Sequence, residues 1–300
     1  MSSTLRHPPV VVGVDGSHRS EAALRWAIRE AATRRIPLRL VSAWNPSFDL
    51  DALGLSRQIV KAHCQAVLDD ATDTVLATAP AVEVTTAGYI GPSTTALIEA
   101  SRGADTVVVG SRGRRAFPAF LLGATSLEVA AHAASPVVVV REGGHSGNAS
   151  GPVVVGIEGT ATSTEALAFA FAYASAHGLS LTALHGYQVE YADGVFSRLA
   201  AEDSRIRLSQ EERALTAEAM AGWQEKYPDV QATAITLQAH PVDALVDAST
   251  AASIVVIGGR HHGRIAGALL GSVGHGVLHG AHCPVAVVRT PSVNPRDLRP

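Results

Sequence analysis

Short apolar runs and longer segments of helical period alternate along the whole chain. Val, Ile and Leu form the short runs, and between them apolar residues recur at the three- and four-residue spacing of amphipathic helices. Continuous apolar runs are typical of strands buried on both faces, as in a parallel sheet covered by helices on both sides. The pattern therefore predicts an α/β protein in which strands and helices alternate.

The expected elements form two similar series. In the first half, strands are expected near residues 9–14, 37–43, 81–87, 105–109 and 136–140, and helices near 19–34, 56–79, 92–102 and 125–134. In the second half, strands are expected near 152–157, 180–185, 231–237, 253–257 and 284–288. Ser17 or Ser20 can cap the first helix, and Thr125 to Glu128 has the spacing of a capping box.

The second half of the sequence repeats the first. Residues 10–17 match residues 153–160, and residues 136–141 match residues 284–289. One long repeat of this kind indicates duplication of a whole domain. A stretch rich in Gly and Ser separates the halves and is typical of a flexible linker. We predict a first domain over residues 1–143, a linker over 144–151, a second domain over 152–290 and an irregular tail over 291–300.

Composition narrows the class of protein. The chain has 300 residues, 47% of them hydrophobic and 17% charged, with a net charge of −3. These values fit a compact soluble protein and exclude an intrinsically disordered chain or one built to bind nucleic acid. Two cysteines cannot form a disulfide framework, the start lacks a signal peptide, and no apolar run reaches the roughly 20 residues that span a bilayer. We expect a cytoplasmic protein without a membrane partner.

The candidate chemistry lies where the fourth strand of the first half ends. Gly110 and Gly113 come first, nine residues follow, and Gly123 then opens a helix. Glycines allow backbone amides to approach an anion closely, and a helix N-terminus adds unpaired amides and a positive dipole end. The spacing therefore favours a polyphosphate ligand, although the P-loop and the dinucleotide fingerprint are both absent.

This glycine pattern, an aspartate (Asp15) at the end of the first strand, and two such halves in one chain resemble the universal stress protein family in its tandem form. The resemblance covers nearly the whole chain. It implies two domains of the adenine-nucleotide α-hydrolase-like (HUP) type, each with a five-stranded parallel sheet and helices on both faces. It also implies bound ATP, accompanied by Mg²⁺.

The resemblance implies nucleotide contacts from the first strand end, from a residue late in the second strand, and from the glycine loop with its helix. In the first half these positions are Gly13, Asp15, Ala43, Gly110, Arg112, Gly113, Gly123, Ala124, Thr125 and Ser126. In the second half they are Gly156, Glu158, Gly258, His261, Gly271, Ser272 and Val273.

Each half departs from the family pattern. Ala124 stands where the motif has Ser or Thr, although Thr125 and Ser126 follow it. In the second half, His261 replaces the second glycine and Glu158 replaces the aspartate, changes that would obstruct the site more. We therefore expect ATP in the first half rather than the second. Asp15 could equally be a turn residue, because Asp-Gly-Ser favours turns by itself, and Arg112 could be a solvated loop residue.

The leading expectation is an ATP-binding, nucleotide-gated regulator in the stress response, acting on an unidentified protein partner and without catalytic residues or a metal site. Slow ATP hydrolysis would be incidental. The resemblance implies that the last strands of the two halves pair and that chains form homodimers. Residues 45–55 are a candidate lid. The alternative is a scaffold of the same fold that no longer binds nucleotide; a nucleotide-consuming enzyme of a related fold is a weaker possibility, because its Ser-Gly-Gly-x-Asp-Ser loop is missing.

Overall fold

The structure is a computed structural model that describes residues 7–44, 57–111, 122–141, 150–158, 164–188, 197–259 and 270–289. The chain divides into two compact units, one within residues 1–144 and the other within residues 145–290. No helix in the described ranges is both long and apolar enough to cross a membrane.

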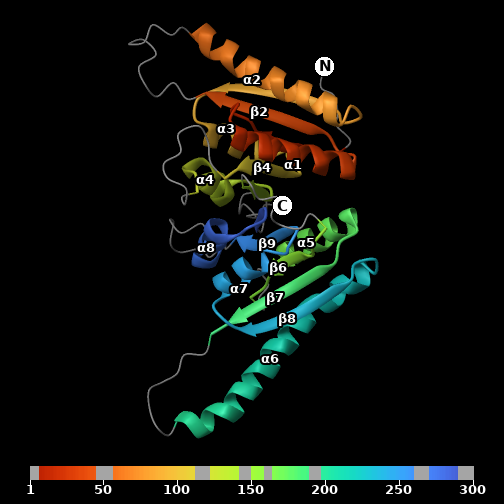
Figure 1. The fold of residues 1–300 in the computed structure, drawn as a ribbon, viewed down its shortest axis with the longest axis vertical. Coiled ribbons are helices and arrows are strands. Elements are labelled where there is room, and N and C mark those ends of the chain that lie inside the picture. The colour runs from red at the N-terminus through yellow and green to blue at the C-terminus, as the bar shows by residue number, and fades with distance from the viewer. Residues whose placement is uncertain are drawn as a thin grey trace, which may run out of the picture. The chain divides into compact units, whose positions relative to one another are not determined.

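The first unit is a five-stranded parallel sheet with four helices (Figure 1). Its strand order is β3-β2-β1-β4-β5, so the central strand β1 pairs with both β2 and β4. The elements are β1 (Val10–Gly13), α1 (His18–Arg34), β2 (Leu38–Trp44), α2 (Arg57–Thr78), β3 (Val84–Ile90), α3 (Ser93–Ser101), β4 (Thr106–Gly110), α4 (Ala124–His132) and β5 (Val137–Val140).

The second unit repeats this topology with the order β8-β7-β6-β9-β10, again all parallel. Its elements are β6 (Val153–Gly156), α5 (Thr164–His177), β7 (Leu181–Tyr187), α6 (Ser197–Lys226), β8 (Ala232–Gln238), α7 (Pro241–Ala248), β9 (Ile254–Gly259), α8 (Ser272–Gly280) and β10 (Val285–Arg289). The α/β fold with two tandem five-stranded parallel sheets is therefore confirmed.

The core of each unit lies on both faces of its central strands. Val10, Val11 and Val12 of β1 are at most 1% exposed, and Val153, Val154 and Val155 of β6 at most 2%. Helices α1 and α2 pack against each other, as do α3 and α4. Because parallel crossovers are right-handed and the chain reverses its direction across the sheet after β3, the two helix pairs cover opposite faces.

A buried serine shows how closely the duplication extends to single hydrogen bonds. The Ser101 hydroxyl accepts from the amide of Ala134 at 2.8 Å, and the Ser249 hydroxyl accepts from the amide of His282 at 2.8 Å. In both units this bond ties the third helix to the segment that follows the fourth. A polar contact retained in both copies supports the interpretation of the sequence repeat as domain duplication.

The third strand begins later than the sequence predicts, at Val84 instead of residue 81. The amide of Val82 donates to the carbonyl of Ala79, so this apolar residue closes a turn after α2 instead of joining the sheet. Val82 is nevertheless buried. An apolar residue in a buried turn cannot be distinguished by pattern alone from the first residue of a strand.

Candidate functional site

A hollow of about 90 Å³ lies at the carboxyl ends of β1 and β4 in the first unit. The helices that follow these strands leave toward opposite faces of the sheet, and ligands bind at such switch points in open α/β sheets. We call this hollow the first cradle. It is lined by Gly13, Val14, Asp15, Ser20, Val41, Ala43, Ser93, Leu97, Val109, Gly110, Thr125 and Ser126.

Two helices begin at the first cradle without a side-chain cap. Helix α3 follows Pro92 and α4 follows Gly123, and neither of these N-cap residues makes a side-chain capping bond. The Ser93 and Thr125 hydroxyl oxygens lie 3.4 Å apart, so the two helix starts meet. The first amides of a helix have no partner inside it. Two positive helix ends therefore face the same hollow, which favours a negatively charged group there.

The turn after β1 brings a carboxylate to the cradle. Asp15 Oδ1 accepts from the Ser17 amide at 3.0 Å and from the Ser17 hydroxyl at 2.6 Å. Ser17 in turn caps α1, with its hydroxyl accepting from the Ser20 amide. Gly16 has a φ of 73°, which an L side chain rarely adopts. Asp15 therefore acts as a turn residue and also lines the cradle, so its two sequence interpretations are compatible.

The start of α4 is fixed against the end of β4. The Ser126 hydroxyl donates to the Gly110 carbonyl at 2.6 Å, and the Gly123 amide donates to the Ser111 carbonyl at 2.8 Å. The capping box predicted at Thr125 is wrong, because α4 begins at Ala124 and Thr125 lies inside the first turn, where its backbone is helical. The Ser126 hydroxyl proton and the Gly123 amide are engaged within the protein.

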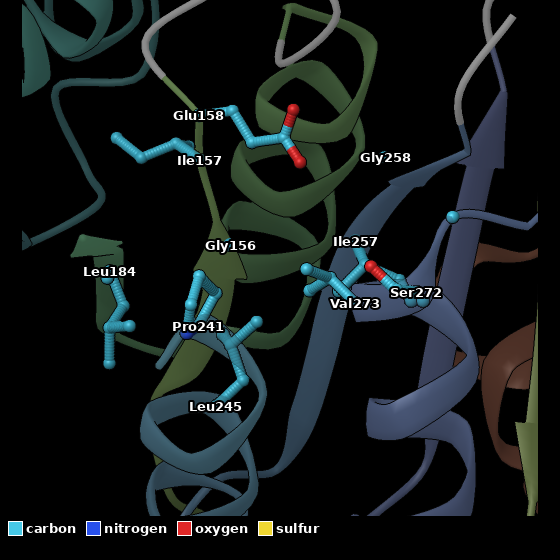
Figure 2. Close-up of a pocket in the computed structure, with 13 residues that line it drawn as sticks. Gly156, Ile157, Glu158, Leu184, Pro241, Leu245, Ile257, Gly258, Ser272 and Val273 are labelled. Carbon is cyan, nitrogen blue, oxygen red and sulfur yellow. The ribbon is translucent and has the colours of Figure 1, made fainter. Parts of the chain in front are cut away.

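The equivalent hollow of the second unit, which we call the second cradle, has a volume of about 60 Å³. Figure 2 shows Glu158 at the end of β6, across the hollow from Ser272 and Val273 at the start of α8, with Pro241 and Leu245 of α7 on a further side. The Ser272 side chain is exposed. The second cradle thus has the same construction as the first.

Its walls are less polar than those of the first cradle. Pro241 opens α7 where Ser93 opens α3, so one backbone donor and one hydroxyl are missing. His240 caps α7 by accepting from the Val242 amide at 3.2 Å, whereas Pro92 cannot cap α3 in this way. The second unit therefore offers fewer unpaired donors to an anion.

Both cradles have a glycine at the end of the first strand, in close contact with a leucine of the third helix. A Cβ on Gly13 would lie 3.1 Å from Leu97 Cδ1, and one on Gly156 would lie 2.9 Å from Leu245 Cδ1. The third helix of each unit therefore packs directly on the strand end. This contact explains why glycine occupies the equivalent position in both copies.

The structure brings most of the expected site residues to these two hollows. In the first unit they are Gly13, Asp15, Ala43, Gly110, Thr125 and Ser126, with Gly123 and Ala124 adjoining them at the start of α4. In the second they are Gly156, Glu158, Gly258, Gly271, Ser272 and Val273. Arg112, Gly113, His261 and the candidate lid at 45–55 lie outside the described residues, so those assignments stay predictions.

The third helix of each unit lines its cradle, which the sequence motifs did not indicate. Ser93 and Leu97 line the first cradle, and Pro241 and Leu245 line the second. These residues follow an edge strand and carry no recognisable motif. The internal repeat could have pointed to these residues, because Ser93 with Leu97 and Pro241 with Leu245 lie at equivalent positions at the start of a helix in the two halves.

Neither cysteine lies at a cradle. Cys64 and Cys283 are both buried. Burial raises the pKa of Cys283 to about 12, so its thiol is protonated at neutral pH. Within the described ranges, no three side chains of the metal-ligating types gather at one point.

Comparison with known proteins identifies the family. The universal stress protein family model matches residues 7–141 and 150–289, one match in each unit. A universal stress protein of Mycobacterium tuberculosis is 36% identical over 308 residues, covering 96% of this chain and 99% of that protein. One of Mycolicibacterium smegmatis is 36% identical over 293 residues, covering 93% and 96%. The crystal structure of a universal stress protein from Archaeoglobus fulgidus aligns with a TM-score of 0.66 at 18% identity, covering 93% of this chain and 98% of that one. The chain therefore belongs to the universal stress protein family, as two tandem copies of its domain.

Proposed function

We propose that the first cradle binds ATP and that the protein is a nucleotide-gated regulator in the stress response. The observation that carries this proposal is the meeting of two uncapped helix starts, at Ser93 and Thr125, beside the ends of β1 and β4. A polyphosphate matches that arrangement because several amides and two helix dipoles can act on it together.

The residues of the first cradle fit a nucleoside triphosphate in two parts. Val41, Leu97 and Val109 supply apolar surface for a base. The enclosed volume of about 90 Å³ is too small for the whole nucleotide, so the phosphates would lie toward the open side, where the helices begin. Mg²⁺ would neutralise phosphate charge, and Asp15 is the carboxylate that lines this hollow.

The first cradle is the better nucleotide site of the two. It offers the Ser93 hydroxyl and amide where the second has Pro241, and it has the shorter Asp15 where the second has Glu158. Ser272 gives the second cradle a hydroxyl that Ala124 does not supply in the first. The loss of a backbone donor outweighs the gain of one exposed hydroxyl, because the amide is fixed in place by the helix.

The role proposed for ATP is to change which conformer of the protein dominates, so that a protein partner senses the nucleotide. Turnover is not part of this proposal, since the described walls of the cradle carry one carboxylate and no paired acid and base. Cytoplasmic location, pairing of the two units through β5 and β10, and a homodimer follow from the family resemblance and are proposed with it.

The test is calorimetric titration with Mg-ATP of the wild type, Ser93→Pro and Pro241→Ser. Ser93→Pro transfers the second unit's residue into the first cradle at a helix position that tolerates proline. We expect a stoichiometry of one and a loss of affinity of about tenfold in Ser93→Pro, because one amide donor and one hydroxyl disappear. Pro241→Ser is the matched control and should leave that affinity unchanged.

The alternative is a scaffold that has lost nucleotide binding, which the altered positions Ala124, Glu158 and His261 favour. It predicts no heat of binding at millimolar ATP and no nucleotide in native mass spectra of the purified, unboiled protein. A stoichiometry of two would instead show that the second cradle also binds ATP.

A further inference from the structure

A larger hollow, of about 380 Å³, lies between α1 and α2 of the first unit. We call it the α1–α2 groove. Its volume is within the range of small-molecule sites, about 300–1,000 Å³, whereas the first cradle encloses about 90 Å³. The groove and the first cradle share Val14 and Ser20 at the turn after β1, but the remaining lining residues differ.

The groove has an apolar floor and two polar walls. Val14, Leu24, Val67 and Ala71 contribute apolar surface to the lining. Helix α1 contributes Glu21, Arg25 and Arg29, and α2 contributes Asp70, Thr74 and Thr78. Residues four apart lie on one face of a helix, so each set forms one continuous wall.

The positive charges on the α1 wall are available to a ligand. Arg25 lies 3.5 Å from Glu21, an exposed pair of the kind that contributes little stability. Arg29 is exposed and has no carboxylate within 4.0 Å among the residues that the structure describes. Its guanidinium can therefore bind an anion without breaking an internal ion pair.

The α2 wall opposite Arg29 offers hydrogen-bond acceptors. The Thr74 hydroxyl donates to the Asp70 carbonyl at 3.0 Å, and the Thr78 hydroxyl donates to the Thr74 carbonyl at 2.7 Å. Both hydroxyl oxygens can still accept. Because their protons are engaged, neither threonine donates to an anion, so Arg25 and Arg29 carry that role, while Glu21 and Asp70 add one negative charge to each wall.

The second unit has no arginines at the positions equivalent to Arg25 and Arg29. Equivalent hydrogen bonds, from Ala79 to Val75 and from Tyr227 to Trp223, align α2 with α6. By this alignment and the sequence repeat, Ala168 and Ala172 occupy the positions of Arg25 and Arg29, and Gly222 that of Thr74. Between α5 and α6, Phe171 stacks with Trp223 and Tyr227, at 6.1 and 5.8 Å between ring centroids.

We propose that the α1–α2 groove is a second ligand site, specific to the first unit, for a small organic anion with an apolar body. The carboxylate, sulfonate or phosphate of such a ligand would pair with Arg29, and Arg25 would add positive charge. The apolar body would cover Leu24, Val67 and Ala71, which lie between the two helices. This site is independent of whether the first cradle binds ATP.

The probe is 8-anilinonaphthalene-1-sulfonate, an aromatic sulfonate whose fluorescence rises in apolar sites. Titration of the full chain at low salt should show one saturable site. Arg29→Gln should weaken binding about fivefold, as expected for one partly exposed charge-assisted contact. Thr74→Trp should abolish this site by filling the groove from the α2 wall, away from the residues shared with the first cradle.

Two matched controls show whether losing an arginine or adding a tryptophan elsewhere on the protein changes probe binding. Arg102→Gln removes an exposed arginine elsewhere in the same unit. Gly222→Trp places the same indole at the equivalent position of α6, where a Cβ would meet no atom within 4 Å. Both controls should bind the probe like the wild type. Unchanged affinity in Arg29→Gln, or equal loss in Thr74→Trp and Gly222→Trp, would overturn the proposal.

Discussion

The two units share one strand order but stabilise their first helix in different ways. In the first unit, Arg34 at the end of α1 makes two hydrogen bonds to Asp105, at 2.6 and 2.8 Å, and one to Glu30 at 3.3 Å. In the second unit, Tyr173 and His177 occupy the positions of Glu30 and Arg34, and their rings stack 4.2 Å apart. Two equivalent positions of the first helix thus hold an ionic network in one unit and a stacked pair of rings in the other. Polar groups buried at such positions need hydrogen-bond partners.

The pair of helices α1 and α2 in the first unit also differs from the equivalent pair, α5 and α6, in the second. The first unit has a groove with polar side chains between α1 and α2. In the second unit, Phe171, Trp223 and Tyr227 stack together at the positions equivalent to Ile28, Val75 and Ala79. After duplication, one copy could gain packing stability while the other kept space for a ligand. This difference predicts that truncating a side chain to alanine will lower the free energy of unfolding by different amounts in the two units.

The largest effect is expected from Phe171→Ala. This side chain is 0% exposed and contacts two further rings, so its removal leaves a cavity and should lower the free energy of unfolding by about 3–5 kcal/mol. Urea unfolding followed by circular dichroism measures the change. Phe169→Ala, at a half-buried position on the same helix, is the control and should cost less. An equal loss of free energy of unfolding in both variants would mean that the aromatic cluster does not stabilise the second unit more than a half-buried ring does.

Arg34→Ala should have the next largest effect. Burial lowers the pKa of Arg34, but the hydrogen bond and charge of Asp105, together with Glu30, outweigh it and raise the pKa above its usual value. Glu30, which is 3% exposed in the wild type, loses this cation when Arg34 is removed. Because Arg34 is itself partly exposed, we expect a loss of about 2 kcal/mol in urea unfolding, less than a fully buried broken pair would cost.

The corresponding truncation in the second unit, His177→Ala, removes a ring contact and leaves no buried charge. Its cost in thermal or urea unfolding should be below about 1 kcal/mol. If Arg34→Ala cost no more than His177→Ala, the ionic network would be a solvated surface feature and the contrast between the units would disappear.

Effects of about 1 kcal/mol are expected from exchanging the residue types at one buried pair of equivalent positions, Ser135 and Cys283. The Ser135 hydroxyl is buried without a hydrogen-bond partner among the described residues, whereas Cys283 is 0% exposed and its thiol contacts the Pro284 carbonyl at 3.4 Å. Ser135→Cys should stabilise the protein by about 1 kcal/mol, because a thiol is easier to bury than an unpaired hydroxyl. Cys283→Ser should destabilise it by a similar amount. A loss of stability in Ser135→Cys, or a gain in Cys283→Ser, would contradict this reasoning.

Alkaline pH gives an independent check on Cys283. Since burial raises the pKa of its thiol from about 9 to about 12, folding favours the protonated form. The stability gained from this thiol is fully present below about pH 9 and is lost as the pH rises toward 12. In Cys283→Ser this part of the alkaline loss should vanish, and in the wild type the native thiol should not react with Ellman's reagent at about pH 8.

The amino-acid sequence by itself determined the order and type of the elements. The central strands β1 and β4 are short apolar runs, and Ser17 caps α1 as predicted. The repeat fixed the number of units and pointed to the family. These properties are local, or compare one stretch of sequence with another, so no knowledge of packing is needed to find them.

Only the tertiary structure decided how the helix starts meet. Ser93 and Thr125 are 32 residues apart in the chain, and no pattern places their hydroxyls 3.4 Å from each other. The failure of the Thr125 capping box has the same origin, because contacts between α4 and β4 set where the helix begins. The α1–α2 groove likewise depends on the space left between two helices. Cavities and converging donors arise from packing between distant segments, and local sequence periodicity carries no information about those distances.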